Sequence, residues 1–112
     1  MAEVTYKIRP EIGSEEINEL VASSWQGIEA DGDWNSILVH SLTWVCAYDQ
    51  ERLVGFVNVA WDGGVHAFIL DTTVHPDMQG RGIGTQLVKR AEAVARSHGL
   101  EWLHVDHEPQ LE

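Results

Sequence analysis

Residues 65–98 narrow the possible folds of this chain more than any other stretch does. They begin with Val65–Val74, a segment apolar on both faces, which is typical of a strand in the centre of a sheet. His75 ends this strand, and a glycine-rich turn follows it. From Ile83 to His98, apolar residues recur at helical spacing, and Gly99 is suited to end the helix. The sequence therefore predicts a buried strand joined by a glycine-rich turn to an amphipathic helix.

Shorter patterns predict four more strands and one more helix. Ser14 is a good N-terminal cap for a helix whose apolar face includes Ile17. Residues 26–35 are rich in glycine and acids, which indicates a loop or a broken helix, and Ile37–Leu42 is compatible with a further helical turn. Gly55 is expected to form a bulge within its strand. The four strands are Val4–Arg9, Thr43–Tyr48, Leu53–Trp61 and Trp102–Val105.

The composition argues against several classes of protein and site. A chain of 112 residues with 44% apolar content has room for a single domain, residues 1–112, with a real core. No apolar run is long enough to span a membrane, and the N-terminus has no signal-peptide core, so we expect a cytoplasmic protein. The single cysteine, Cys46, rules out an internal disulfide and a cysteine-ligated zinc site, and we expect no metal. With 18 acidic and 7 basic residues, the surface is expected to bind neither nucleic acid nor membrane.

The glycine-rich turn has the composition of an anion-binding site. From Gln79 to Thr85 it reads QGRGIGT, with glycines at positions 80, 82 and 84. Glycines let the backbone turn sharply, and several N–H groups at the start of the following helix then point the same way. These groups and the positive end of the helix suit a phosphate or pyrophosphate, and Arg81 adds a full positive charge. The spacing fits neither the dinucleotide-binding fingerprint nor a P-loop.

The same turn carries a family signature. Gln79, Gly82 and Gly84 match the pattern Gln/Arg-x-x-Gly-x-Gly/Ala, and the chain resembles the GNAT superfamily of N-acetyltransferases. Its flanks agree, because Leu70–Pro76 resembles the family's fourth strand and Leu87–Gly99 its third helix. The resemblance covers essentially the whole chain. It implies an α/β fold with a mixed, mostly antiparallel central sheet and helices on both faces, without the family's last helix and last two strands.

The resemblance also implies acetyl-CoA as the cosubstrate. In the family, the pantetheine arm pairs with the fourth strand, in an opening where the fourth and fifth strands splay apart. The pyrophosphate lies on the amides of the glycine-rich turn. By this resemblance, the CoA-binding residues are Thr72, Val74, Gln79, Gly80, Arg81, Gly82, Ile83, Gly84 and Thr85.

The implied reaction is direct transfer of the acetyl group to a primary amine of a small molecule or peptide. A base must take the proton of the amine, and the two candidates are His104 on the fifth strand and Asp71 on the fourth. His104 can instead be a half-exposed strand residue, and Asp71 a carboxylate that anchors a turn. The N–H of Val74 would stabilise the oxyanion. Trp25 and Trp34 flank the acidic loop, which either provides an aromatic floor for a cationic acceptor or is simply solvated.

The chain departs from the family pattern after the fifth strand. Family members continue with a helix, often carrying a tyrosine that protonates the leaving thiolate, whereas this sequence stops at Glu112. Its only tyrosines, Tyr6 and Tyr48, match no such position. The sequence is then either a piece of a longer protein or a short variant. Two alternatives to an enzyme follow, namely a non-catalytic CoA-binding module and an interaction module with the same fold.

The fifth strand, Trp102–Val105, is expected to mediate association. If no later strand covers it, its outer edge presents unpaired N–H and C=O groups, and Pro109 comes too late to protect them. A C2 homodimer that covers this edge is therefore expected. The net charge of −11 opposes it, so association should strengthen with salt.

Overall fold

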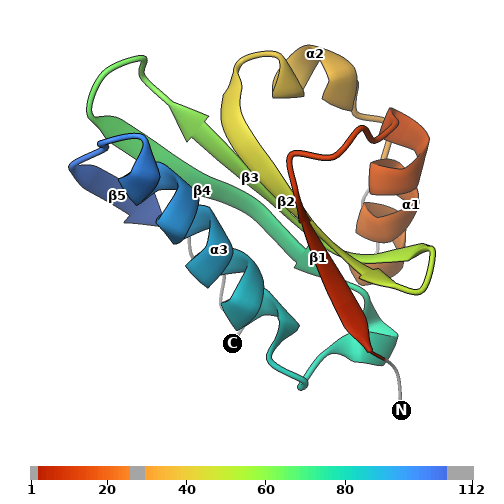
Figure 1. The fold of residues 1–112 in the computed structure, drawn as a ribbon. Coiled ribbons are helices and arrows are strands. Elements are labelled where there is room, and N and C mark those ends of the chain that lie inside the picture. The colour runs from red at the N-terminus through yellow and green to blue at the C-terminus, as the bar shows by residue number, and fades with distance from the viewer. Residues whose placement is uncertain (1–2, 26–29, 106–112) are drawn as a thin grey trace.

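The computed structural model describes residues 3–25 and 30–105 (Figure 1). Within these residues, five strands and three α-helices follow one another, with a short 3-10 turn, η1, before the last helix. The elements are β1 (Val4–Ile8), α1 (Ser14–Ser24), α2 (Trp34–Leu38), β2 (Ser41–Asp49), β3 (Arg52–Trp61), β4 (His66–Val74), η1 (Pro76–Met78), α3 (Ile83–Ser97) and β5 (Trp102–Val105).

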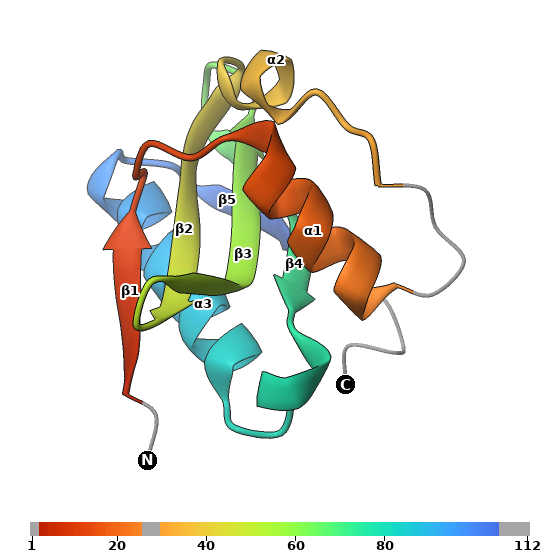
Figure 2. The same ribbon diagram turned by 90° about the vertical axis from the view of Figure 1, so that its right-hand side faces the viewer.

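The strands form one sheet in the order β1-β2-β3-β4-β5. Each neighbouring pair is antiparallel except β4 and β5, which are parallel and are connected through α3. Helices α1 and α2 lie on one face of the sheet and α3 on the other (Figure 2). The predicted α/β class, with a mixed and mostly antiparallel sheet, is confirmed.

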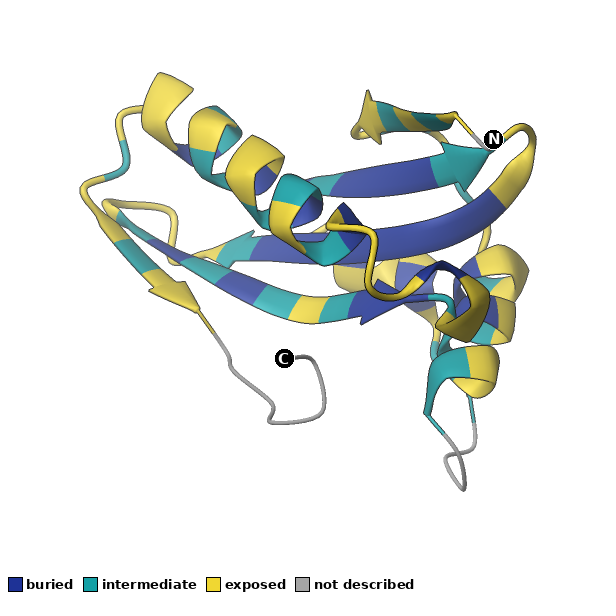
Figure 3. Ribbon diagram, turned by 90° about the horizontal axis from the view of Figure 1, so that it is seen from below, coloured by how far each residue is buried: buried dark blue, intermediate teal, exposed yellow. Residues whose placement is uncertain are grey.

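Each face of the sheet has its own buried cluster. On the α3 face, Leu87 and Ala91 pack against strand residues such as Val57, and all three are fully buried. On the other face, Ile17 of α1 packs with Phe56 of β3, both also fully buried. Strand β3 serves both clusters because successive side chains of a strand point to opposite faces. The middle of the sheet is accordingly buried, whereas the outer side of α3 is exposed (Figure 3).

The start of α1 differs from the prediction. The N-terminal cap is Gly13, and Ser14 is already the first helical residue, so the predicted Ser14 cap is wrong. The Ser14 hydroxyl instead accepts the N–H of Trp34 at 2.9 Å, which ties α1 to the start of α2. Asp33 caps α2 by accepting the N–H and hydroxyl of Ser36, and these bonds lower the pKa of its carboxyl. The further helical turn therefore lies earlier than expected.

Strand β3 contains the predicted bulge. Gly55 pairs with Ala47 and Leu53 with Tyr48, so one extra residue, Val54, is accommodated beside Gly55. A Cβ at Gly55 would lie 3.0 Å from Cδ1 of Leu87, so glycine lets α3 approach the strand closely at this point.

Candidate active site

Strand β4 has a bulge of its own, which the sequence did not predict. Asn58 of β3 pairs with Leu70 and Phe56 pairs with Thr73, so two residues of β4 stand against one residue of β3. Asp71 is at this point and has a φ of +60°, in the left-handed region. A bulge bends its strand and increases the local twist. The second half of β4 therefore leaves the direction of the first half.

The parallel pairing of β4 with β5 ends just before this bulge. The register runs from His66 opposite Trp102 to Ile69 opposite Val105. Among the described residues, no strand lies against the outer edge of Thr72–Val74. Figure 1 shows β4 continuing well past the end of β5. Within the described part of the chain, this edge of the second half of β4 corresponds to the opening that the resemblance implies between the fourth and fifth strands.

The main chain of this segment is oriented by its bonds to β3. The N–H of His75 donates to the carbonyl of Val54 at 2.8 Å. Main-chain groups of successive strand residues face opposite sides, so those of Val74 and Thr72 face the opening. The carbonyl of Val74 accepts the Ser24 hydroxyl and the Gln79 amide, each at 3.1 Å. These two bonds fix the end of β4 between α1 and the glycine-rich turn.

The glycine-rich turn forms an open cradle at the start of α3. Gly80 and Gly82 both have a φ of +80°, and a Cβ on either would meet no heavy atom within 4 Å. Gly82 is the N-terminal cap of α3, and the first helical bond runs from Gln86 N–H to the Gly82 carbonyl at 3.0 Å. The N–H groups at positions 83–85 precede that bond, so the helix itself does not use them. The arrangement suits an anion that approaches the backbone closely.

Side chains around the turn hold it against the sheet. Met78 is buried with 4% exposure and anchors η1 in the α3 cluster. His75 caps η1, since its Nδ1 accepts the N–H of Asp77 at 3.1 Å. Arg81 is exposed beside the cradle, whereas the side chain of Gln79 is turned back onto Val74. In this arrangement of the turn, the Arg81 side chain can therefore reach a pyrophosphate in the cradle, whereas the Gln79 side chain is bonded to Val74 instead.

The two candidate bases lie on the same face of the sheet. His104 pairs with Phe68, and Asn58 pairs with Leu70, which places all four on the face that carries α1. The carboxylate of Asp71 accepts the side-chain amide of Asn58 at 3.3 Å, so it lies on this face too. Both His104 and Asp71 are exposed. The structure thus brings both candidates to the side of β4 where the opening begins.

Two functional contacts escaped the sequence reasoning. His66 Nδ1 lies 3.0 Å from His104 Nε2, whereas the sequence indicated His66 only as a weaker candidate base, without this contact. Asn58 is buried with 2% exposure, and its amide oxygen accepts the Ser41 hydroxyl at 2.6 Å. Because the Ser41 hydroxyl occupies the amide oxygen of Asn58, the amide nitrogen is turned toward Asp71. A polar residue inside an otherwise apolar strand was the signal that could have identified Asn58.

The two tryptophans of the acidic loop have different surroundings. Trp34 is buried, its ring centre is 5.3 Å from that of Phe56, and its Nε1 donates to Asn18, so it is a core residue rather than an acceptor floor. Trp25 is half-buried, with its Nε1 3.5 Å from the Thr73 hydroxyl near the end of β4. Residues 26–29 of the loop lie outside the described part of the chain.

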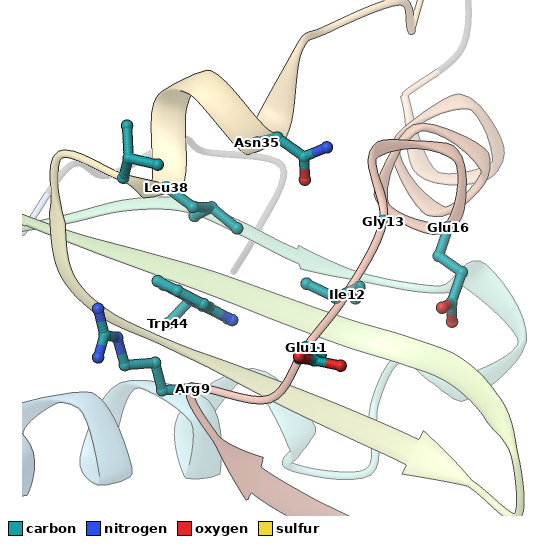
Figure 4. A pocket seen from close by; sticks show the side chains of 9 residues that line it. Arg9, Glu11, Ile12, Gly13, Glu16, Asn35, Leu38 and Trp44 are labelled. Atoms are coloured by element: carbon teal, nitrogen blue, oxygen red, sulfur yellow. The ribbon is translucent and has the colours of Figure 1, made fainter.

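A separate hollow of about 630 Å³ lies at the other edge of the sheet (Figure 4). Trp44 forms its floor, donating from Nε1 to the carbonyl of Pro10 at 2.9 Å, and the Arg9 guanidinium lies 5.2 Å from the Trp44 ring centre. Glu11 and Glu16 line the same hollow. It is built by β2, α2, the β1–α1 connection and the start of α1, so it is not part of the site at β4.

Metal and thiol chemistry find no support in the described residues. Within residues 3–25 and 30–105, no three His, Cys, Asp or Glu side chains are placed to hold a metal ion. Cys46 is fully buried, and burial raises the pKa of its thiol to about 12, so it is not a nucleophile at neutral pH. No helix in the same residues is long and apolar enough to cross a membrane.

Comparison with known proteins agrees with this geometry. The model of the acetyltransferase (GNAT) family matches residues 10–111. The chain belongs to the GNAT acetyltransferase family. An uncharacterized N-acetyltransferase ycf52 of Porphyra purpurea is 46% identical over 43 residues, which are 35% of this chain and 25% of that protein. The matched stretch thus spans about a quarter of that curated relative.

Solved GNAT structures share the fold over almost the whole chain. The GNAT family protein SP0256 from Streptococcus pneumoniae TIGR4 is 25% identical, with a TM-score of 0.78 over 96% of this chain and 77% of that one. The GNAT family N-acetyltransferase YhbS from Escherichia coli, solved in complex with CoA, is 18% identical. It has a TM-score of 0.75 over 99% of this chain and 66% of that one.

Proposed function

We propose that this GNAT domain, residues 1–112, is an acetyl-CoA-dependent N-acetyltransferase that acts on a primary amine of a small molecule or peptide. The observation that carries the proposal is one juxtaposition. The outward main-chain groups of Thr72 and the outward N–H of Val74 lie next to the open glycine cradle at the start of α3. A ligand with an extended arm and a pyrophosphate at its end could therefore pair its arm with the edge of β4 and place its pyrophosphate in the glycine cradle.

The residues at this site fit the parts of acetyl-CoA. The pantetheine arm pairs with Thr72 and Val74 as an added strand. The pyrophosphate lies on the amides of Gly80, Arg81, Gly82, Ile83, Gly84 and Thr85, with the Arg81 guanidinium as a counter-charge. Gly80 and Gly82 leave the space that a Cβ would fill, so the phosphates can approach the backbone. Gln79 contributes by fixing the end of β4 through Val74.

The acetyl transfer needs a neutral amine and a stabilised oxyanion. His104 or Asp71 takes the proton of the amine, and the amine nitrogen then attacks the thioester carbonyl. The N–H of Val74 faces the opening and donates to the oxygen on which negative charge develops. Collapse of the tetrahedral intermediate releases the CoA thiolate. Solvent can protonate it because the pKa of a thiol is about 8.5.

Titration calorimetry with acetyl-CoA tests the binding half of the proposal. We expect saturable binding that Arg81→Gln weakens by roughly tenfold, the loss of one charge-assisted contact of about 1.4 kcal/mol. Lys89→Gln removes the same charge from an exposed position further along α3 and should change the affinity little. Absence of saturable binding would leave an interaction module with a GNAT fold.

Thiol release from acetyl-CoA with a panel of primary amines then tests catalysis. Release that depends on the amine supports the enzyme, whereas binding without release supports a non-catalytic CoA-binding module. His104→Ala and Asp71→Asn identify the base, because its removal lowers kcat with little change in the KM for acetyl-CoA. A cytoplasmic location, a C2 homodimer and the lack of nucleic-acid or membrane binding remain predictions.

A further inference from the structure

His66 and His104 meet on the sheet face that carries α1. Nδ1 of His66 and Nε2 of His104 are 3.0 Å apart, which is hydrogen-bonding distance. The two ring centres are 5.2 Å apart, and the ring planes differ by 18°. Because the two nitrogens are much closer together than the ring centres, the rings meet edge to edge rather than face to face. One ring N–H therefore points at the lone pair of the other ring.

Two neighbouring rings hold this arrangement. The ring centres of Phe68 and His104 are 4.9 Å apart, and their planes differ by 17°. The ring centres of Trp102 and His66 are 6.2 Å apart, and their planes differ by 14°. The parallel register of β4 and β5 produces this row, because it sets His66 opposite Trp102 and Phe68 opposite His104. Within the row, His104 is the histidine nearer the bulge at Asp71, and His66 is nearer the β3–β4 hairpin.

A hydrogen bond between two neutral imidazoles links their tautomers. If His104 donates from Nε2, its own Nδ1 keeps a lone pair, and His66 carries its proton on Nε2. A proton taken up at Nδ1 of His104 can then displace the shared proton toward His66. The pair in this state can accept a proton at one end and release one at the other without leaving a charge on either ring.

We propose that His66 and His104 act as one proton-transfer pair in the acetyl transfer, an inference that rests on the proposed function. The proton of the acceptor ammonium passes to Nδ1 of His104, the Nε2 proton of His104 passes to Nδ1 of His66, and the Nε2 proton of His66 leaves to water. The neutral amine forms the bond to the thioester carbon. The reverse sequence, starting from water at His66, delivers the Nδ1 proton of His104 to the CoA thiolate when the C–S bond breaks. This resets the pair, and Nδ1 of His104 then takes the second proton of the former amine nitrogen, which leaves to water by the first route. The products are a neutral amide and the free thiol.

A carboxylate is bonded to the main chain of His66. Oδ1 of Asp62 accepts the main-chain N–H of Gly64 at 2.7 Å and that of His66 at 3.3 Å. The Gly64 bond holds the pKa of Asp62 below its usual value, and a charge on His66 acts in the same direction. Asp62 is therefore ionised at neutral pH and places a negative charge near His66, the residue that passes the proton to water.

Steady-state kinetics on the intact chain, with acetyl-CoA and the best amine of the panel, test the pair. His104→Ala should lower kcat by roughly 100-fold, the usual contribution of a general base. His66→Phe keeps a ring beside Trp102 but removes both nitrogens, and should lower kcat roughly tenfold with an unchanged KM for acetyl-CoA. His66→Asn keeps a polar atom near the position of Nδ1 and should restore part of the loss. His40→Phe, at an exposed histidine between α2 and β2, should change nothing.

A double-mutant cycle and a spectroscopic measurement separate the outcomes. In the His104→Ala background, His66→Phe should have no further effect, because the pair has already lost its first member. Full activity of His66→Phe beside an impaired His104→Ala overturns the pair but leaves the proposed base. If neither variant changes kcat, the pair and the His104 base both fail. In ¹⁵N-labelled protein, a through-hydrogen-bond coupling between His66 Nδ1 and His104 Nε2 should be observed, and its absence overturns the pair independently of activity.

Discussion

Single residues at the site are constrained by their main-chain angles as much as by their chemistry. Gly80 and Gly82 have a φ of +80°, and Asp71 has a φ of +60°. This left-handed region costs most residues about 1–2 kcal/mol, while glycine adopts it freely and Asn and Asp tolerate it better than others. The sequence predicted that Gly82 lies in an anion-binding turn. The structure adds that Gly82 also contributes to the stability of the turn.

We predict that Gly82→Ala reduces both stability and cofactor affinity. The left-handed angle should cost about 1–2 kcal/mol in the free energy of unfolding, and the new methyl group should obstruct the cradle. Gly84→Ala is the matched control, because its Cβ would meet only Cγ2 of Val74 at 3.7 Å, an ordinary contact. Urea unfolding and acetyl-CoA titration measure the two effects. Equal behaviour of the two variants would contradict the role given to the left-handed turn.

We predict that the protein loses stability in alkali because of Cys46. Burial raises the pKa of its thiol to about 12 from an ordinary value of 9.0. Between these values the folded protein keeps a proton that the unfolded chain has lost, so the free energy of unfolding falls as pH rises. The slope from this thiol alone approaches about 1.4 kcal/mol per pH unit. Urea unfolding across this pH range should show a shallower fall for Cys46→Ala, and an unchanged slope would refute the assignment.

At the scale of elements, the sequence predicted all five strands and both longer helices, because alternation and helical spacing are local signals. The bulge at Asp71 and the register of β4 on β5 could not be predicted in the same way. Both depend on which residues of neighbouring strands fall opposite one another. His66 and His104 are 38 positions apart, so their contact exists only through that register. The displaced helix cap at Ser14 has a similar origin, because its hydroxyl serves α2 instead.

We predict that Gly55→Ala weakens the packing of α3 on the sheet. The new Cβ would stand 3.0 Å from Leu87 Cδ1 and 3.1 Å from both Ala47 Cβ and Ile83 Cγ2, so these neighbours must give way by a few tenths of an ångström. Overpacking of this kind costs about 1–3 kcal/mol. Gly13→Ala, where a Cβ meets nothing within 4 Å, should leave stability nearly unchanged. Because Ile83 begins α3, a displaced helix should also weaken acetyl-CoA binding, and full affinity would show that the cradle is independent of this packing.

At the scale of the whole molecule, the net charge opposes association between copies of the chain, whereas the exposed edge of β5 favours it. The net charge of −11 makes copies of the chain repel one another, most strongly at low salt. Among the described residues, the outer edge of β5 has no neighbouring strand, and Trp102 and Val105 are 58% and 52% exposed. An edge of this kind favours pairing with another strand.

We therefore predict a homodimer whose population rises with salt, because salt screens the repulsion while the strand pairing is unaffected. Light scattering after size exclusion, at low and moderate salt, measures it. Val105→Lys places a charge on the edge and should shift the equilibrium toward the monomer. A 12.5 kDa species at tens of micromolar protein under both conditions would contradict the prediction.

The bulge at Asp71 sets which face of the sheet the side chains of each half of β4 point to. Strict alternation from the Asn58–Leu70 pair would set Val74 opposite Val54, and Thr73 and Val74 would exchange faces. One left-handed residue absorbs this offset, so the first half of β4 stays matched to β5 and the second half to the glycine-rich turn. A β-branched residue at position 71 would disfavour the left-handed angle and disturb the bulge, so its effect on activity would not report on proton transfer. Asparagine, which tolerates the same angle, is the substitution that tests the carboxylate alone.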